Sequence, residues 1–246
     1  MVDWDVILGA LPDFFQGLRI TLTLLALSLV GGFVLAVPLA TARVSRRRWL
    51  SAPVWFYTYV IRGTPLLVQL FMLYFGLAQF EWIRESTAWT LLRSPWFCAW
   101  LAFSLNTAAY TTEIFAGALR NTPNGELEAA RSLGLTQAQI YRRILWPGAL
   151  RRALPQYSNE VVGLMHATAI ASTVTLVELT RVARDVYSNH LMPVEAFGTV
   201  AVFYFILTFS LAGLFKLVER RYLRHLRPKE VTAATAAPPQ ASLALR

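Results

Sequence analysis

Residues 122–150 have the sequence TPNGELEAARSLGLTQAQIYRRILWPGAL and form a long polar interruption between apolar segments. The pattern predicts two short helices joined by a turn. Thr122 is expected to cap the first helix with Pro123 at its first position, because proline has no N–H to leave unsatisfied there. Gly134 is expected to end that helix, since glycine readily adopts the left-handed conformation of a C-terminal cap.

The second helix of this stretch is predicted to begin at Thr136. Gln139 follows at the spacing of a capping box, and Pro147 marks where the helix stops or kinks. Small and apolar side chains on an exposed helical turn are suited to docking against another protein. An amphipathic loop that merely covers the ends of neighbouring helices would show the same pattern, so the residues alone leave both interpretations open.

The flanking sequence is unusually apolar. The chain is 56% hydrophobic and only 15% charged, whereas a soluble domain has roughly a quarter of charged residues. A membrane-spanning helix needs about 20 mostly apolar residues, and five segments qualify: 18–42, 54–80, 96–119, 157–177 and 197–218. The sequence therefore predicts an all-α integral membrane protein with five transmembrane helices.

The second of these segments contains Arg62 and Pro65. An arginine at mid-bilayer costs about 3 kcal/mol on insertion scales. We therefore expect residues 49–62 to follow the cytoplasmic interface and the crossing to begin near Thr64, with Pro65 in its first turn.

The net charge of +9 comes mainly from arginines between the apolar segments. Connections 43–53 and 119–154 and the tail from Lys216 hold seventeen Lys and Arg, against four in the remaining connections. The positive-inside rule places the former group in the cytoplasm, the amino terminus outside and the carboxyl terminus inside. This distribution fits topology and a lipid environment, and it indicates no nucleic-acid partner.

Three regions follow from this topology. Residues 1–17 are predicted as a periplasmic segment whose acidic residues argue against a cleavable signal. Residues 18–219 form the transmembrane domain, and residues 220–246 a basic cytoplasmic tail that is disordered after about residue 230. The outer connections are too short to form a solute receptor, so any receptor must be another protein.

The long connection resembles the EAA loop of bacterial ABC importer permeases. The resemblance rests on the run Glu128-Ala129-Ala130, on Gly134, and on Ile144 and Pro147, which follow Gly134 after an interval of nine residues. Trp146 departs from the leucine usual in that pattern. In the family this loop forms the coupling helix that fits a groove of the ATPase subunit, which implies a coupling role for Glu128, Ala129, Ala130, Gly134 and Leu135.

The resemblance extends over about residues 17–229. RGTPLLVQLF (62–71), NTAAYTTEIFAGALR (106–120), ALPQYSNEV (153–161) and LVERRYLRHLRPK (217–229) are similar to the polar amino-acid branch, most closely to the M-type subunit of importers for histidine, lysine, arginine and ornithine. This implies a MetI-like type I permease fold in the bacterial inner membrane and a basic amino acid or opine as substrate. It also implies a Q-type sister permease, a dimeric ATPase that holds ATP and Mg, and a periplasmic binding protein, with no cofactor in this chain.

Polar residues within the predicted spans are candidates for the substrate path, because hydrocarbon offers them no partner. They are Asn106, Tyr110 and Glu113 in the third segment and Asn159, Glu160 and His166 in the fourth. Alternatively, each glutamate is a structural carboxylate paired with Arg62, Arg120 or another arginine near the cytoplasmic ends. The histidine is equally consistent with a hydrogen-bonded packing residue.

The sequence fits two other classes of function less well. A membrane enzyme is disfavoured, because the sequence has no nucleophile elbow, no metal-ligand spacing among its three histidines and no lysine after a glycine for a Walker A loop. Catalytic and metal-binding residues are therefore not expected. A proton-coupled secondary transporter using Glu113 and Glu160 is the main alternative, although such proteins commonly show duplicated halves that are not visible here.

Overall fold

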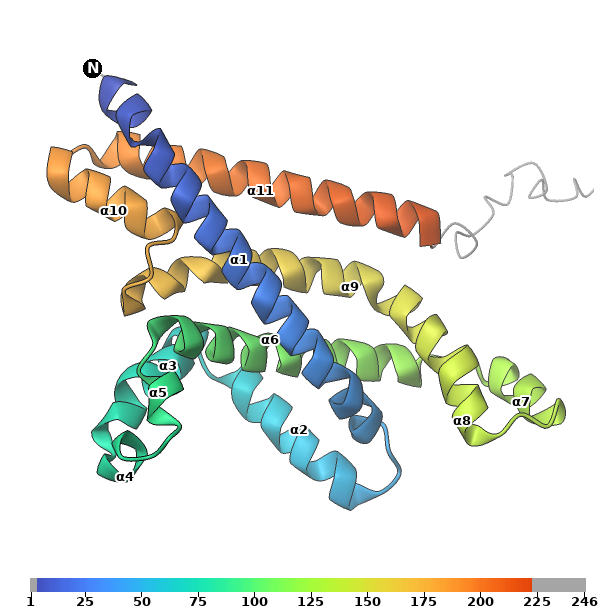
Figure 1. The fold of residues 1–246 in the computed structure, drawn as a ribbon. Helices are drawn as coiled ribbons and strands as arrows, with labels where there is room; N and C mark the ends of the chain where they lie inside the picture. The colour runs from blue at the N-terminus through green and yellow to red at the C-terminus, as the bar shows by residue number, and fades with distance from the viewer. Residues whose placement is uncertain (1–3, 223–246) are drawn as a thin grey trace, which may run out of the picture.

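The computed structural model describes residues 4–222, which fold into helices joined by short connections (Figure 1). The π-helical segments are η1 and η3, and the 3₁₀ segments are η2 and η4. In chain order the elements are α1 (Trp4–Arg43), α2 (Arg48–Gly63), α3 (Leu66–Phe71), η1 (Met72–Gly76), η2 (Leu77–Gln79), α4 (Glu81–Arg84), α5 (Trp89–Leu92), α6 (Pro95–Arg120), α7 (Asn124–Ser132), α8 (Gln137–Ile140), η3 (Tyr141–Leu145), α9 (Trp146–Ala167), η4 (Thr168–Val174), α10 (Leu179–His190) and α11 (Pro193–Tyr222). The prediction of an all-α protein is confirmed.

Helix α6 lies at the centre of the molecule. It packs against α1, α2, α3 and α9, and most of its side chains are buried (Figure 1). With 26 residues it is about 39 Å long, which suffices to cross a bilayer. Because its neighbours cover it, α6 carries serine, threonine and asparagine side chains instead of a lipid-facing apolar surface.

The contact between α1 and α6 depends on two glycines. A Cβ atom built on Gly31 would lie 2.7 Å from the Ser104 hydroxyl oxygen, and one built on Gly32 would overlap the methyl group of Thr107. Close approach through small residues is the usual way that helices associate in membranes, where the hydrophobic effect between helices is weak. The indole N–H of Trp100 also donates to the Leu27 carbonyl at 3.1 Å across the same contact.

The described helices differ in whether they are long and apolar enough to cross a membrane. Residues Asp5–Arg43 and Pro193–Tyr222 are long and apolar enough to cross a membrane singly. Arg48–Gly63 with Leu66–Gln79, and Gln137–Val174 with Leu179–His190, qualify only as pairs bent by 103° and 50°. Between two and four spans therefore meet these criteria within residues 4–222, and the prediction of five, which adds the polar α6, remains a prediction.

The interruption predicted in the second segment is present. Helix α2 ends at Gly63, Thr64 and Pro65 are extended, and α3 begins at Leu66. Pro65 therefore precedes α3 as its cap instead of lying in its first turn, which corrects the prediction. The physical reason is that Pro65 has a ψ of 134°, so its backbone is not yet helical.

Three further boundaries differ from the predictions. Thr122 does not cap α7, because its hydroxyl donates to the Leu119 carbonyl. Pro147 does not stop its helix: it lies at the start of α9, directly after the π-helical η3, and α8, η3 and α9 run on without a break, so only the predicted end of the helix is wrong. The predicted connection after residue 177 contains the amphipathic helix α10. The predicted disorder after about residue 230 lies outside the described residues.

Glu178 fixes the start of α10. Its carboxylate accepts hydrogen bonds from the backbone N–H groups of Thr180 and Arg181, both at 2.9 Å, and from the Tyr204 hydroxyl at 3.1 Å. The side chain is completely buried. Glu178 therefore caps α10 and also bonds to Tyr204 of α11, which ties the two helices together. The sequence patterns did not indicate this buried carboxylate.

We predict that Gly32→Val destabilises the protein by about 2 kcal/mol, because the added side chain has no space against Thr107 and Ala108. Gly9→Val in the same helix is the matched control, since nothing lies within 4 Å of a Cβ atom at that position. Thermal unfolding of the purified variants in detergent measures the effect. Equal midpoints for the two variants would contradict close packing of α1 on α6.

Candidate functional site

The connection between α6 and α9 forms a defined helical turn. Gly134 has a φ of +73°, and its N–H donates to the Arg131 carbonyl at 2.9 Å. The N–H of Leu135 donates to the Ala130 carbonyl at 3.2 Å. These two bonds constitute a Schellman motif, which closes α7 and reverses the chain. The predicted left-handed glycine is confirmed.

The helix after the turn begins as predicted at Thr136. The Thr136 hydroxyl accepts from the Gln139 N–H at 3.4 Å, and the Gln139 side chain accepts from the Thr136 N–H at 2.9 Å. This reciprocal capping box fixes the direction in which α8 leaves the turn. In Figure 1, α7 and α8 lie together at one end of the molecule, far from α4 and α10.

Residues of the predicted coupling set differ in exposure. Glu128 and Ala129 are exposed and Leu135 is half-buried, whereas Ala130 is buried, with only 2% of its surface exposed. Leu133, which lies directly before the glycine, is 80% exposed. Among these residues, Glu128, Ala129 and Leu133 are therefore available to a partner, whereas Ala130 holds α7 against the rest of the chain.

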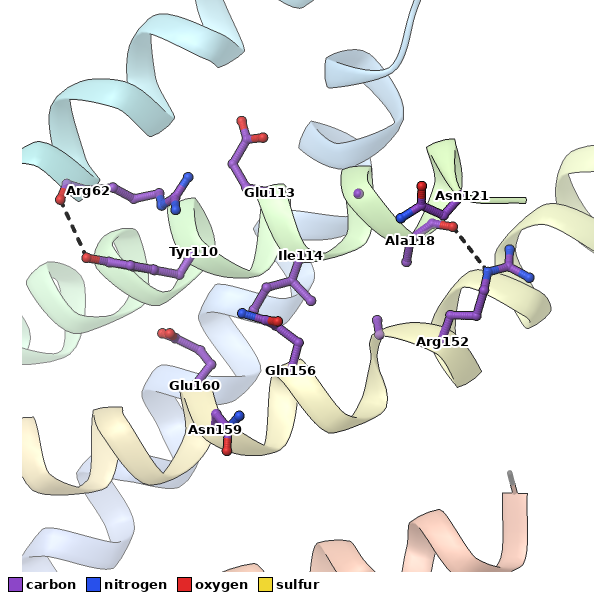
Figure 2. Close-up of a pocket in the computed structure, with 12 residues that line it drawn as sticks. Arg62, Tyr110, Glu113, Ile114, Ala118, Asn121, Arg152, Gln156, Asn159 and Glu160 are labelled. Atoms are coloured by element: carbon purple, nitrogen blue, oxygen red, sulfur yellow. Dashed lines mark hydrogen bonds between the residues drawn. The ribbon is translucent and has the colours of Figure 1, made fainter. Parts of the chain in front are cut away.

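A polar cavity of about 630 Å³ lies between α6 and α9, near the ends that join the turn. Figure 2 shows Gln156 and Glu160 projecting from α9 toward α6, with Arg62 beside Tyr110. The cavity is lined by Arg62, Tyr110, Glu113, Ile114, Gly117, Ala118, Asn121, Arg152, Ala153, Gln156, Asn159 and Glu160. Four of the six predicted path residues thus lie at one cavity.

A second cavity, of about 470 Å³, continues from this one toward the opposite ends of α6 and α9. Its lining includes Asn106, which completes a set of five predicted residues at the two cavities. The remaining lining residues are Arg62, Gly63, Thr64, Pro65, Leu66, Tyr110, Glu160, Gly163, Leu164 and Ala167. The break between α2 and α3 therefore forms one wall of the second cavity, whereas Arg62 alone reaches the first from this segment.

Glu113 has structural partners. Its Oε1 atom lies 2.6 Å from Nε of Arg43 and accepts a hydrogen bond from the Thr58 hydroxyl at 2.8 Å. In Figure 2 the carboxylate points away from Glu160 and Gln156. The ion pair joins α1 to α6 and the Thr58 hydrogen bond adds α2, so Glu113 borders the cavity while its charge is already compensated.

Two other predicted residues also bond within the fold. The Asn106 side-chain amide donates to the side-chain oxygen Oε1 of Gln69 at 3.1 Å. His166 Nε2 lies 2.9 Å from the Thr208 hydroxyl of α11, and His166 lines neither of the two cavities. Asn159 and Glu160 remain as the predicted residues of α9 at the cavity.

Sequence patterns alone missed Arg62 and Gln69 as parts of this site. Gln69 donates its side-chain N–H groups to the Ile61 carbonyl at 2.7 Å and to the Thr64 hydroxyl at 2.8 Å, which stabilises the break after α2. The signal for both was the run RGTPLLVQ, in which a charge, a helix break and an amide occur within eight residues. We expected this arginine at the cytoplasmic interface and as one possible ion-pair partner of the glutamates, and did not assign it to the substrate path.

The comparison with protein families identifies the chain. Residues 19–224 match the family of binding-protein-dependent transport system inner membrane components. The chain belongs to this family. Among its members, HisM of Escherichia coli (strain K12), a histidine/lysine/arginine/ornithine transport system permease protein, is 47% identical over 226 residues, which cover 92% of this chain and 95% of HisM.

An opine permease of the same family is nearly as similar. The nopaline transport system permease protein NocM of Agrobacterium fabrum (strain C58) is 42% identical over 93% of this chain and 95% of its own length. A solved structure of an amino acid ABC transporter with histidines matches with a TM-score of 0.80 and 32% identity, over 90% of this chain and 99% of that one. The MetNI methionine transporter matches with a TM-score of 0.70 at 21% identity, over 88% of this chain and 97% of that one, which supports the MetI-like fold.

We predict that Glu113→Gln lowers the stability of the permease by about 2 kcal/mol, because it leaves Arg43 without its charged partner. Glu81→Gln, on an exposed position of α4, is the control. The midpoint of thermal unfolding in detergent measures the change. If Glu113→Gln unfolds like Glu81→Gln, the Arg43–Glu113 pair does not hold these helices together.

Proposed function

We propose that this permease is one membrane subunit of an ATP-driven importer for basic amino acids or opines. The names of HisM and NocM assign these permeases to the transport of such solutes. The same holds for the octopine permease OccM of Rhizobium meliloti, which is 44% identical over 88% of this chain. Within the chain itself, the observation that best supports this proposal is the pair of cavities between α6 and α9. A carboxylate and an aromatic ring line both cavities, and both groups attract a cation. These relatives give no support to the alternative function, that of a proton-coupled secondary transporter.

The importer is proposed to contain four kinds of protein. This chain pairs with a Q-type sister permease in the bacterial inner membrane, with its amino terminus in the periplasm and its carboxyl terminus in the cytoplasm. A dimeric ATPase binds ATP and Mg and docks at the coupling loop through Glu128, Ala129 and the turn at Gly134. A periplasmic binding protein delivers the solute. The exposed Leu133 beside the left-handed glycine supports the docking site.

The substrate path is proposed to follow the two cavities. Glu160 and Tyr110 line both of them, and Asn159 lines the cytoplasmic one. A carboxylate and an aromatic face both attract a cation, and each interaction strengthens where water is excluded. Asn106, Glu113 and His166 are proposed to shape and support this path through Gln69, Arg43 and Thr208.

The test is uptake by vesicles that contain the permease, its sister, the ATPase and the binding protein. We expect ATP inside the vesicles to drive accumulation of arginine, lysine, histidine or an opine, and expect no uptake when the ATPase or the binding protein is omitted. The control is the same assay with a proton gradient and no ATP. Accumulation driven by that gradient in this subunit alone would overturn the importer assignment.

We predict that Gly134→Val uncouples the importer. A β-branched residue at a φ of +73° is strained by about 1–2 kcal/mol, so the turn changes shape and uptake per ATP hydrolysed falls by about tenfold. Gly134→Asn, which tolerates the left-handed region, should retain uptake. Gly125→Val on open helix α7 is a second control. Normal coupling in Gly134→Val would show that the turn does not transmit ATP hydrolysis.

A further inference from the structure

The two cavities between α6 and α9 share three lining residues: Arg62, Tyr110 and Glu160. Asn121 and Arg152 line the first cavity toward the coupling loop, whereas Thr64 and Ala167 line the second toward the opposite end. The three shared residues come from α2, α6 and α9 respectively. These three residues therefore surround the junction of the two cavities, which form the two halves of the proposed path.

Arg62 is the only cation of this trio. Its guanidinium carbon lies 5.1 Å from the centre of the Tyr110 ring, which is the geometry of a cation–π contact. The Tyr110 hydroxyl donates to the Arg62 carbonyl at 3.5 Å. Figure 2 shows the arginine side chain above the ring and Glu160 on the facing helix. The Tyr110 ring therefore holds the charge of Arg62 in the opening between α6 and α9.

The charge of Arg62 is only loosely compensated. Within residues 4–222 the ion pairs closer than 4.0 Å are Arg43–Glu113 and Arg181–Asp185, and neither includes Arg62. The Glu160 carboxylate is near enough to interact electrostatically with Arg62 without touching it. Arg62 is thus attracted to Glu160 and Tyr110 but is not locked to either by a salt bridge.

The helix break fixes where this arginine lies. Arg62 occupies the last turn of α2, and the extended residues Thr64 and Pro65 follow. Gln69 of α3 donates to the Ile61 carbonyl in the last turn of α2 and to the Thr64 carbonyl in the break itself. The backbone at the break is therefore held, while the long Arg62 side chain carries the charge into the opening.

We propose that Arg62 is a resident counter-ion that the cationic group of the substrate replaces at Tyr110 and Glu160. One carboxylate and one ring face attract either guanidinium but compensate only one at a time. A cationic solute therefore displaces Arg62 and joins the two cavities, whereas a neutral solute of the same shape leaves it in place. This assignment rests on the proposed import of basic amino acids and makes Arg62 a specificity-determining residue.

The test measures binding of three ligands, in detergent, to the complex of this permease with its sister permease and the ATPase, from which the binding protein is left out. Arginine carries both a guanidinium and a carboxylate, agmatine carries the guanidinium without the carboxylate, and citrulline is the neutral analogue of arginine. If Arg62 competes with the substrate cation, Arg62→Gln should bind arginine and agmatine about tenfold more tightly and citrulline unchanged. Arg62→Lys, which keeps the charge, should stay near the parent protein.

A contrary role for Arg62 gives the opposite result. An arginine that binds the substrate carboxylate would make Arg62→Gln bind arginine and citrulline more weakly and agmatine unchanged, which would overturn the proposal. Equal affinities of Arg62→Gln and the parent protein for all three ligands would also overturn it. Arg84→Gln on α4, outside both cavities, controls for the general loss of a positive charge.

A second variant tests the exchange with Arg62 in place. Glu160→Gln removes the shared carboxylate, so affinity for arginine and agmatine should fall about tenfold while affinity for citrulline is kept. Unchanged affinity for agmatine would contradict the proposal even if Arg62→Gln did not assemble. Absence of ATP-driven uptake in the parent importer would overturn the proposed function, whereas the agmatine comparison would still report on the exchange at Arg62.

Discussion

The uninterrupted helical run from Gln137 to Val174 joins the loop proposed to meet the ATPase to the cavities proposed to carry the solute. It consists of α8, the π-helical η3, α9 and the 3₁₀ segment η4. Glu160 lies on it, about 35 Å along the axis from Gln137. A displacement of the capped turn at Thr136 therefore reaches Glu160 along one helical run, without crossing a flexible connection, although Pro147 and Pro155 each remove one hydrogen bond from that run. The π-helical segment at Tyr141–Leu145 is the place where this run departs from regular geometry.

Within residues 4–222, the polar residues of the membrane domain fall into two groups, those that bond directly to another helix and those that lack a direct ion pair. Glu113, Asn106 and His166 each bond to another helix and stabilise the packing of α1, α2, α3 and α11 around α6 and α9. Arg62 and Glu160 face each other across the cavities without a direct ion pair. A compensated charge holds helices together, whereas a loosely compensated one remains free to exchange partners, and this difference separates structural residues from those proposed for transport.

Much of this architecture could be predicted from the sequence, because local rules determine it. The left-handed Gly134 and the Thr136–Gln139 capping box follow from a few adjacent residues, and the break at Pro65 follows from proline chemistry. The partner of Glu113 could not be predicted, because Arg43 is 70 residues away and several arginines were equally suitable. The continuity of α9 through Pro147 was missed because a proline early in a helix resembles one that ends it.

We infer from this continuity that the run from Gln137 to Val174 moves as one body when the coupling turn is displaced. Spin labels at Ala138→Cys and Val162→Cys, in a Cys98→Ser background, report its length in the reconstituted importer, and labels at Tyr59→Cys and Val162→Cys report its position relative to α2. On trapping ATP at the ATPase, the account predicts an unchanged distance for the first pair and a changed distance for the second. A change within the first pair with none in the second would contradict it.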